Sequence, residues 1–366
     1  MRTDRASADR LRIAVIASAR YPIRQPFPGG LEAHTWQLAQ RMRARGHDVT
    51  VFAGPGSDAT LGVRELPALP PISDLARSDV SMPADWFLAE HHAYLTLMLH
   101  LGERDAPYDV VHNNSLHYLP IAMAASTTAR VLTTLHTPPN PWLESAVQIP
   151  SADPVRFVAV SEYAAAQWRR RIPATGVVRN GVDTELWVRG PGGGRPVWSG
   201  RIVPDKGPVE AIRAARLAGT GLRLAGPTPD RAWFREHVEP LLGGGIDYVG
   251  HLDHTRLVEL VGSATTAVVS PCWDEPYGLV VAEALACGTP VAGFARGALP
   301  ELLDETCGVL APPGDIEGLA EAIRRAATLD RDAARGHAER TCSVETMIDE
   351  YERHYRELAP TPVAAA

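Results

Sequence analysis

The sequence has little that would suit a membrane span, an oxidising compartment or a nucleic-acid partner. Its four cysteines form no CxxC pair and no Cys/His spacing suited to zinc, which excludes a disulfide scaffold. Its apolar runs are shorter than the ~20 residues that span a bilayer, and no signal-peptide core follows the first arginines. A net charge of -7 excludes a global basic field. We therefore expect a soluble, cytosolic protein without a nucleic-acid partner.

Lysine is almost absent. Of 36 basic residues, Lys206 is the single lysine and all others are arginine. Such a bias is typical of a GC-rich genome, and one lysine can survive it by chance. The alternative is that Lys206 is retained for a function, which makes its surroundings worth examining.

Short Val/Ile-rich runs alternate with helical patterns along the first half of the chain. The predicted strands cover 12–18, 48–54, 109–114, 130–136 and 155–161, and a helix covers 31–45. Continuous apolar strands separated by helices indicate a parallel sheet that is covered on both faces.

The pattern then restarts after a Gly/Pro-rich loop over 189–196. The second set of strands covers 195–200, 222–226, 246–250, 265–270, 289–294 and 307–311, with helices over 207–218, 255–262, 278–287 and 315–328. A last helix over 344–358 carries an apolar stripe. We predict two doubly wound α/β domains, residues 1–173 and 174–343, facing across a ligand cleft.

Gly29 and Gly30 directly precede the first helix. The turn lacks the G-x-G-x-x-G of a dinucleotide site, which argues against a dehydrogenase. Glycines let the backbone approach a ligand closely, and helix N-terminal amides favour phosphate. A structural turn is the alternative.

Arg201 and Lys206 follow the strand that opens the second domain. Two cations at the carboxyl end of a strand are suited to neutralising a diphosphate. The alternative is a pair of solvated surface cations, and the position of the single lysine here favours function.

Two glutamates flank a helix N-terminus in the segment 270–291. Glu275 ends a loop, and Glu283 lies in an apolar helix that begins near Gly278. Carboxylates accept paired hydrogen bonds from sugar and ribose hydroxyls. Glu283 could instead be an exposed helix residue, but an unpaired carboxylate among apolar neighbours is costly.

We predict no metal site. Asp330-Arg331-Asp332 has the D-x-D pattern of a metal-bound nucleotide but lies between the predicted helices, where solvated charges are expected. The run Arg169-Arg170-Arg171 is likewise expected to face solvent, so it does not support a membrane partner.

The run EPYGLVVAE resembles the E-x7-E motif of retaining glycosyltransferases of family 4, which have the GT-B fold. PGGLEAH, SGRIVPDKG and GALPELL are similar to that family's Gly-Gly loop, G-R-x4-K-G and G-G-x-P-E motifs, in the same order. Three positions depart from the pattern: His136-Thr137 replaces the frequent His-Asp, Gly297-Ala298 replaces Gly-Gly, and Asn114 stands where a second His is frequent.

The resemblance implies roles for individual residues. Arg201 and Lys206 would hold a donor diphosphate, Glu283 the ribose, and Gly29 with Gly30 would bring the first domain against the phosphates. Glu275 and His136 would have catalytic roles. For His136, a structural role is equally open. The transferred sugar would contact Glu275 and the residues after it, namely Pro276, Tyr277, Gly278, Leu279 and Val280. The final helix would cross back onto the first domain.

The implied activity is a hexosyltransferase that uses a nucleotide-diphosphate sugar, by family preference a UDP-hexose, with retention and without a metal or other cofactor. The acceptor stays open between a small molecule, a glycan and a lipid, and no oligomeric state is predicted. A GT-B sugar-nucleotide epimerase and a non-catalytic nucleotide-sugar-binding module remain alternatives.

Overall fold

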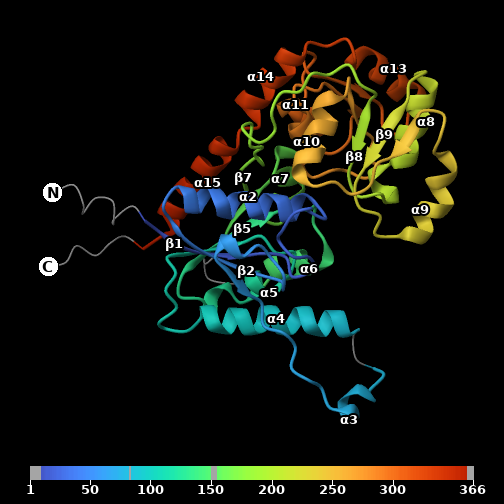
Figure 1. Cartoon of the computed structure of the whole chain (residues 1–366). Coiled ribbons are helices and arrows are strands. Elements are labelled where there is room, and N and C mark those ends of the chain that lie inside the picture. Colours follow the sequence, from blue (N-terminus) through green and yellow to red (C-terminus); the bar gives the residue numbers. More distant parts are fainter. Residues whose placement is uncertain (1–9, 82–83, 150–154, 361–366) are drawn as a thin grey trace, which may run out of the picture.

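The first domain is a seven-stranded parallel sheet. The computed structural model describes residues 10–81, 84–149 and 155–360. The strand order is β3-β2-β1-β4-β5-β6-β7, which is the doubly wound arrangement (Figure 1). Its strands are β1 (Arg12–Ile16), β2 (Asp48–Ala53), β3 (Val63–Glu65), β4 (Val110–Asn113), β5 (Arg130–Leu135), β6 (Val155–Ala159) and β7 (Gly176–Val177).

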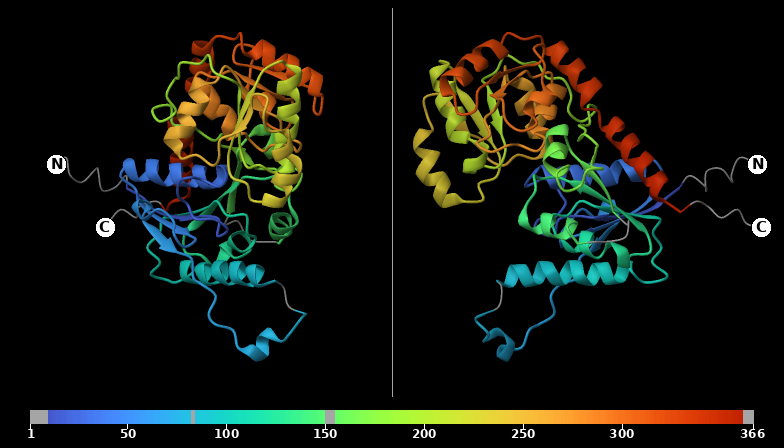
Figure 2. Two further views of the ribbon diagram at one scale, coloured as in Figure 1. Left: turned by 45° about the vertical axis from the view of Figure 1, so that its right-hand side comes forward. Right: turned by 180° about the vertical axis from the view of Figure 1, so that it is seen from behind.

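The helices of this domain pack on both faces of the sheet. They are α2 (Gly30–Ala44), α3 (Asp74–Arg77), α4 (Asp85–Leu101), α5 (Leu119–Ala122), α6 (Pro141–Val147) and α7 (Glu162–Trp168), with short 3-10 turns η1 (Ala59–Leu61) and η2 (Ala124–Ser126). Helix α2 begins after Gly29 and ends before Gly46, whose φ of +90° continues no helix. The segment that carries α3 projects beneath α4, away from the second domain (Figure 2).

The second domain repeats the plan with six parallel strands in the order β10-β9-β8-β11-β12-β13. These are β8 (Val197–Ser199), β9 (Leu222–Ala225), β10 (Ile246–Tyr248), β11 (Ala267–Val269), β12 (Val291–Phe294) and β13 (Gly308–Ala311). Around them lie η3 (Pro204–Lys206), η4 (Glu239–Leu241), α8 (Pro208–Leu217), α9 (Arg231–His237), α10 (His254–Ser263), α11 (Leu279–Ala286), α12 (Leu299–Leu302), α13 (Ile316–Ala326), α14 (Arg331–Thr341) and α15 (Val344–Leu358). None of the helices in the described ranges combines the length and apolarity that a membrane crossing needs.

All eleven predicted strands are present, so the expected pair of doubly wound domains is confirmed. The sequence did not predict β3, β7, α9 and α14. Strands β3 and β7 are short edge strands of the first sheet, α9 buries no side chain, and α14 is mostly polar, so their hydrophobic patterns are weak. Strand β7 extends the first sheet beyond residue 173.

One prediction about Asp330-Arg331-Asp332 is wrong: the run starts a helix instead of lying between helices. Asp330 is the N-cap of α14, and its carboxylate accepts the amide of Asp332 at 2.9 Å. The Asp332 carboxylate forms an ion pair with Arg189. Both carboxylates therefore have structural partners.

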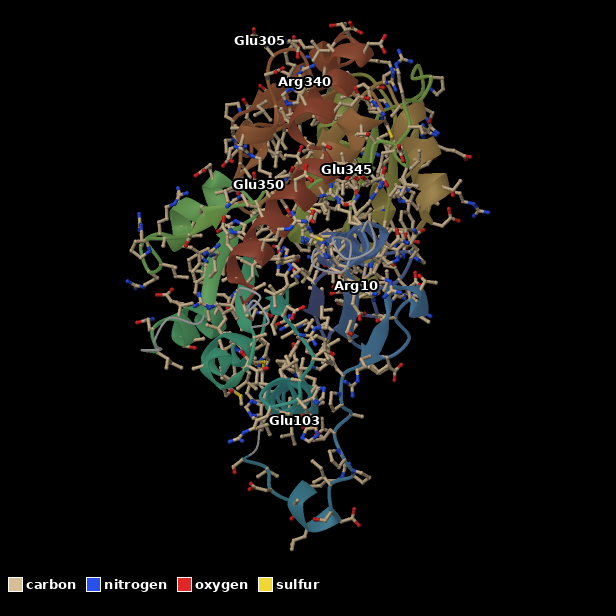
Figure 3. All side chains as sticks on the ribbon, turned by 90° about the vertical axis from the view of Figure 1, so that its left-hand side faces the viewer. Arg10, Glu103, Glu305, Arg340, Glu345 and Glu350 are labelled. Atoms are coloured by element: carbon tan, nitrogen blue, oxygen red, sulfur yellow. The ribbon has the colours of Figure 1, made fainter. Side chains whose placement is uncertain are left out.

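Helix α15 leaves the second domain and packs into the core of the first (Figures 1 and 3, where Glu345 and Glu350 mark it). The predicted apolar stripe is buried there: Met347, Tyr351, Tyr355 and Leu358. On its polar side, Arg45, the C-cap of α2, pairs with Glu352 at 2.8 Å and with Glu345 at 2.7 Å. The helix thus ties residues 344–358 to the first domain.

The Tyr355 hydroxyl meets Nδ1 of the buried His112 at 2.6 Å, and Nε2 of that ring meets Thr134 Oγ1 at 2.8 Å. Burial lowers the pKa of His112 well below its usual range, so the ring is neutral and needs both hydrogen bonds. We expect Tyr355→Phe to leave Nδ1 unpaired and to cost about 1–3 kcal/mol of unfolding free energy. The measurement is the midpoint of urea unfolding, compared between proteins whose unfolding free energy depends on urea concentration with the same slope.

The control is Tyr108→Phe, because the Tyr108 ring is half-buried against Phe52 at 6.0 Å. A Tyr355→Phe midpoint equal to that of the control would show that the His112 contact contributes nothing to stability.

Candidate active site

A cavity of about 450 Å³ lies between the carboxyl ends of the two sheets. Both domains line it, as two facing doubly wound sheets require. From the first domain come Gly29, Gly30, Glu32 and His34; from the second come Arg201, Lys206, Gly226, His251, Glu275, Gly278, Leu279, Val280 and Glu283.

The first domain presents the N-terminus of α2. Gly29 is its N-cap and offers no side-chain acceptor, and the carboxylate of Glu32 in the first turn lies beside it, 3.1 Å from where a Cβ of Gly29 would stand. A Cβ at Gly30 would lie 3.1 Å from Cδ1 of Leu279 in α11. The absence of a side chain at Gly30 therefore allows the N-termini of α2 and α11 to approach across the cavity.

Lys206 and Glu275 form the central ion pair of the cavity. The Lys206 Nζ donates to both carboxylate oxygens of Glu275 at 2.7 Å. Trp273 Nε1 donates to Glu275 Oε2 at 3.0 Å, and its ring lies 5.3 Å from the same ammonium. The side chains are only 22% and 15% exposed, so solvent screens the pair weakly.

Two glycines hold the backbone that carries this pair. Gly207 follows Lys206 with φ +66°, and a Cβ there would lie 1.8 Å from the Ser270 carbonyl oxygen. Gly297, with φ +58°, would place a Cβ 2.2 Å from the Glu275 carbonyl oxygen. Ala298 has φ -84° and donates its amide to that oxygen at 2.8 Å, so the departure from Gly-Gly costs nothing here.

Arg201 lies exposed just beyond β8 and faces Glu32 of α2 across the cavity. Burial raises the pKa of Glu32, and the positive charge of Arg201 opposes that rise. This part of the cavity thus has the Arg201 cation on one wall and the poorly hydrated carboxyl group of Glu32 on the other.

Glu283 faces the cavity from the second turn of α11. Its apolar surroundings raise its pKa to about 7. A carboxyl held among apolar neighbours gains a large benefit from any ligand hydroxyl that donates to it.

Two predicted residues do not line the cavity. Pro276 is buried, and Tyr277 is 3% exposed with its hydroxyl donated to the Asn180 carbonyl at 2.5 Å. Tyr277 packs in the core at the domain junction, and the Pro276 carbonyl accepts a hydrogen bond from Ser161 of the first domain. The loop turns at Gly278, whose φ of +102° brings the α11 amides back to the cavity.

His136 also lies behind the lining. Its Nε2 meets Asn114 Oδ1 at 2.8 Å, and His34 stands beside it with ring centroids 4.9 Å apart. Burial, with smaller effects from His34 and His112, lowers the pKa of His136 well below its usual range. His136 is therefore neutral, and Asn114 fixes its orientation.

Sequence reasoning missed the far end of the cavity. His251 and Leu252, just after β10, line it, and His251 Nε2 meets the Phe27 carbonyl of the first domain at 3.1 Å. His34 was missed as well: both its ring nitrogens are buried without a partner in the described structure. The position of Gly250-His251 at the end of a strand was the available signal.

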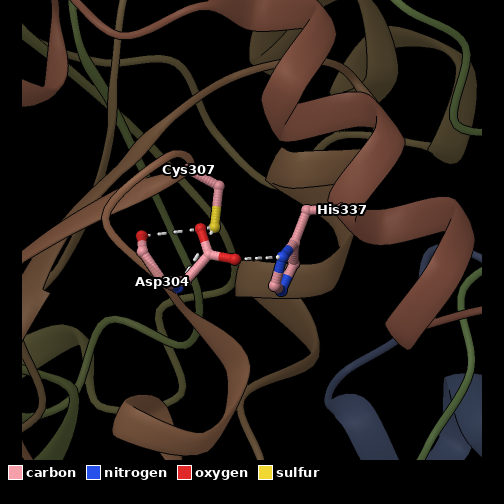
Figure 4. Close-up of side chains that lie close together, drawn as sticks. All are labelled: Asp304, Cys307 and His337. Atoms are coloured by element: carbon pink, nitrogen blue, oxygen red, sulfur yellow. Dashed lines mark hydrogen bonds and ion pairs between the residues drawn. The ribbon is translucent and has the colours of Figure 1, made fainter.

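One cluster outside the cavity has metal-ligand chemistry. Asp304, Cys307 and His337 place ligand atoms within 4.8 Å of one another (Figure 4). His337 Nε2 donates to the Leu302 carbonyl at 3.0 Å, and Nδ1 faces Asp304 Oδ2 at 3.0 Å. The Cys307 thiol meets the Asp304 carbonyl at 3.6 Å, so each group has a protein partner and the cluster braces α14 against the loop after α12.

Family comparisons match nearly the whole chain. Residues 28–186 match the model of Glycosyltransferase Family 4, and residues 197–339 match that of Glycosyl transferases group 1. A glycogen synthase of Mycobacterium tuberculosis is 30% identical over 351 residues, covering 84% of each chain. A D-inositol 3-phosphate glycosyltransferase of Mycolicibacterium smegmatis is 28% identical and covers 96% of this chain and 94% of its own.

The fold is also similar to a solved structure of Anabaena HepE in complex with UDP-glucose. The TM-score is 0.71 at 18% identity, covering 95% of this chain and 100% of the other. At that identity, the likeness concerns the fold.

The raised pKa of Glu283 makes a prediction for stability. Because the folded pKa of about 7 lies above the ordinary 4.5, ionisation destabilises the fold increasingly as pH rises from about 4.5 to 7. We expect Glu283→Gln to be more stable than wild type at pH 8.5, by at most about 3 kcal/mol, and to gain less at pH 5.5. Denaturant titrations of the ligand-free protein measure this, and a difference independent of pH would contradict the assignment.

Proposed function

This chain belongs to glycosyltransferase family 4 and is a glycosyltransferase, and from that premise we propose that it transfers a hexose from UDP-hexose with retention and without a metal. The observation that carries the proposal is the convergence of Arg201, Lys206 and two helix N-termini on one cavity. Retention follows the family, and the UDP-glucose bound to the Anabaena protein supports the donor.

In this proposal, the site must stabilise the negative charge that develops on the leaving diphosphate. Breaking the bond between the anomeric carbon and the β-phosphate oxygen leaves a diphosphate with growing negative charge. Arg201 faces that position from just beyond β8 and Lys206 from η3, and the first amides of α2 and α11 face it from opposite walls. Fixed cations and dipoles in a water-poor site stabilise such charge strongly.

Glu275 and Lys206 neutralise each other in the ligand-free protein. A diphosphate competes for the ammonium, which releases a carboxylate oxygen for the hydroxyls of the transferred sugar. Trp273 Nε1 keeps hold of Oε2 at 3.0 Å and preserves the orientation of the carboxylate. Glu275 thus changes partner on donor binding without leaving its place.

Glu283 lies beyond the diphosphate position and is proposed to accept the ribose hydroxyls. His251 and Leu252 would then lie beside the base, where the His251–Phe27 contact closes the cavity between the domains. Closure excludes water, which would otherwise hydrolyse the donor.

The proposed function is tested with a thermal-shift screen of UDP-, GDP-, ADP- and TDP-hexoses in EDTA, followed by assays of nucleotide release and sugar transfer. A bound donor stabilises by mass action, and we expect UDP-hexose to give the largest shift and turnover to survive EDTA. Activity that EDTA abolishes and Mg²⁺ restores would contradict metal independence. Epimerised sugar, or binding without any turnover, would contradict transfer.

Lys206→Arg should damage turnover although it keeps the charge. The ammonium fits between both oxygens of Glu275 in a site that leaves 22% of the side chain exposed. A planar guanidinium is wider, and a shift of ~1 Å in the reacting groups costs on the order of 100-fold in rate.

We expect kcat/KM to fall by about that factor for Lys206→Arg and less for Arg201→Lys, because Arg201 is exposed and has room. A Lys206→Arg enzyme within about threefold of wild type would show that the single lysine is an accident of composition.

A further inference from the structure

The loop that carries Glu275 is held from the other domain. Ser161, the N-cap of α7, is 1% exposed, and its Oγ accepts the Ala164 amide at 2.9 Å. The same hydroxyl donates its hydrogen to the Pro276 carbonyl at 2.6 Å. One buried serine in the first domain therefore caps its own helix and binds the residue directly after Glu275.

The residue before Glu275 has a partner on the same helix. Tyr163 donates its hydroxyl to Asp274 Oδ2 at 2.8 Å. Asp274 also lies 3.4 Å from Arg296 Nε, close to Gly297. The two neighbours of Glu275 are thus bound to the start of α7, Pro276 through its carbonyl and Asp274 through its side chain.

Glu301 of α12 completes the connection. Its carboxylate accepts the α7 amides of Glu162, at 3.0 Å, and of Tyr163. The same short helix follows Ala298, whose amide donates to the Glu275 carbonyl. We call Ser161, Tyr163 and Glu301 the interdomain clasp.

We propose that the interdomain clasp positions the Glu275 carboxylate for turnover, so that Ser161, Tyr163 and Glu301 act as positioning residues across the domain boundary. The inference rests on the proposed function, in which Glu275 exchanges Lys206 for the donor sugar. During that exchange the side chain loses one anchor, and its main chain must stay in place. The bonds from Ser161 and Tyr163 of the first domain, one on each side of Glu275, keep it there.

The clasp should affect rate more than nucleotide affinity. Arg201, Lys206 and Glu283, which are proposed to bind the nucleotide, lie just beyond β8, in η3 and in α11 of the second domain. The clasp instead fixes the loop that orients the sugar. A misplacement of ~1 Å at that point costs on the order of 100-fold in rate.

The experiment compares Ser161→Ala with Ser343→Ala. Both substitutions remove a serine N-cap, because Ser343 Oγ accepts the Glu345 amide at 3.2 Å at the start of α15. Ser161→Ala also removes the bond to Pro276. We expect UDP release from UDP-glucose to show a kcat reduced about tenfold in Ser161→Ala alone, with Kd for UDP within about twofold of wild type.

Tyr163→Phe provides a second variant, since it removes a hydroxyl and leaves the ring. Its effect on kcat should be smaller, because its bond to Asp274 is exposed, and the double variant with Ser161→Ala should deviate from additivity. Independent, additive effects would indicate separate stability losses instead of one shared loop.

Hydrogen–deuterium exchange of residues 272–278 gives a readout that does not require turnover. Exchange should increase in Ser161→Ala and stay at the wild-type rate in Ser343→Ala. Unchanged exchange, or a Ser161→Ala kcat within twofold of wild type, overturns the clasp while leaving the proposed function intact. A wild-type protein that releases no UDP counts against the proposed function, and the exchange comparison then decides the clasp.

Discussion

The ion pair between Lys206 and Glu275 is the interaction on which the site depends. A cation in a half-enclosed cavity needs a counter-charge, and Glu275 supplies it through both oxygens at 2.7 Å. In the proposed function, donor binding is an exchange of anions at this one ammonium, which avoids leaving a buried charge without a partner.

Backbone proximity makes that ion pair possible. Lys206 and Glu275 belong to different loops, and each loop passes a neighbouring strand or turn so closely that a Cβ would overlap it. Gly207 lies against Ser270 and Gly297 against Glu275, both with positive φ. Two glycines therefore set the distance between the charges.

The site is complete only when both domains contribute. The Gly30–Leu279 approach and the His251–Phe27 contact join the walls of the cavity, while α15 returns the chain to the first domain. The hydrophobic core at the junction contains Trp168 of the first domain and Tyr277 of the second. The loop that carries Glu275 consequently borders that core, and its conformation reflects how the two domains meet.

The sequence by itself determined eleven of the thirteen described strands and six of the residues that line the cavity, namely Gly29, Gly30, Arg201, Lys206, Glu275 and Glu283. The Val/Ile pattern of a strand is visible within a few residues of sequence. Gly, Arg, Lys and Glu just after such a strand indicate a ligand site in the same short segment. Tertiary structure alone decided which of these side chains are buried and which distant residues meet. It buried Tyr277 and Pro276, placed His136 behind His34, and joined Asp304 and Cys307 to the distant His337. These outcomes depend on which elements pack together over long sequence separations, and side-chain burial is a property of that packing, not of the neighbouring residues in the chain.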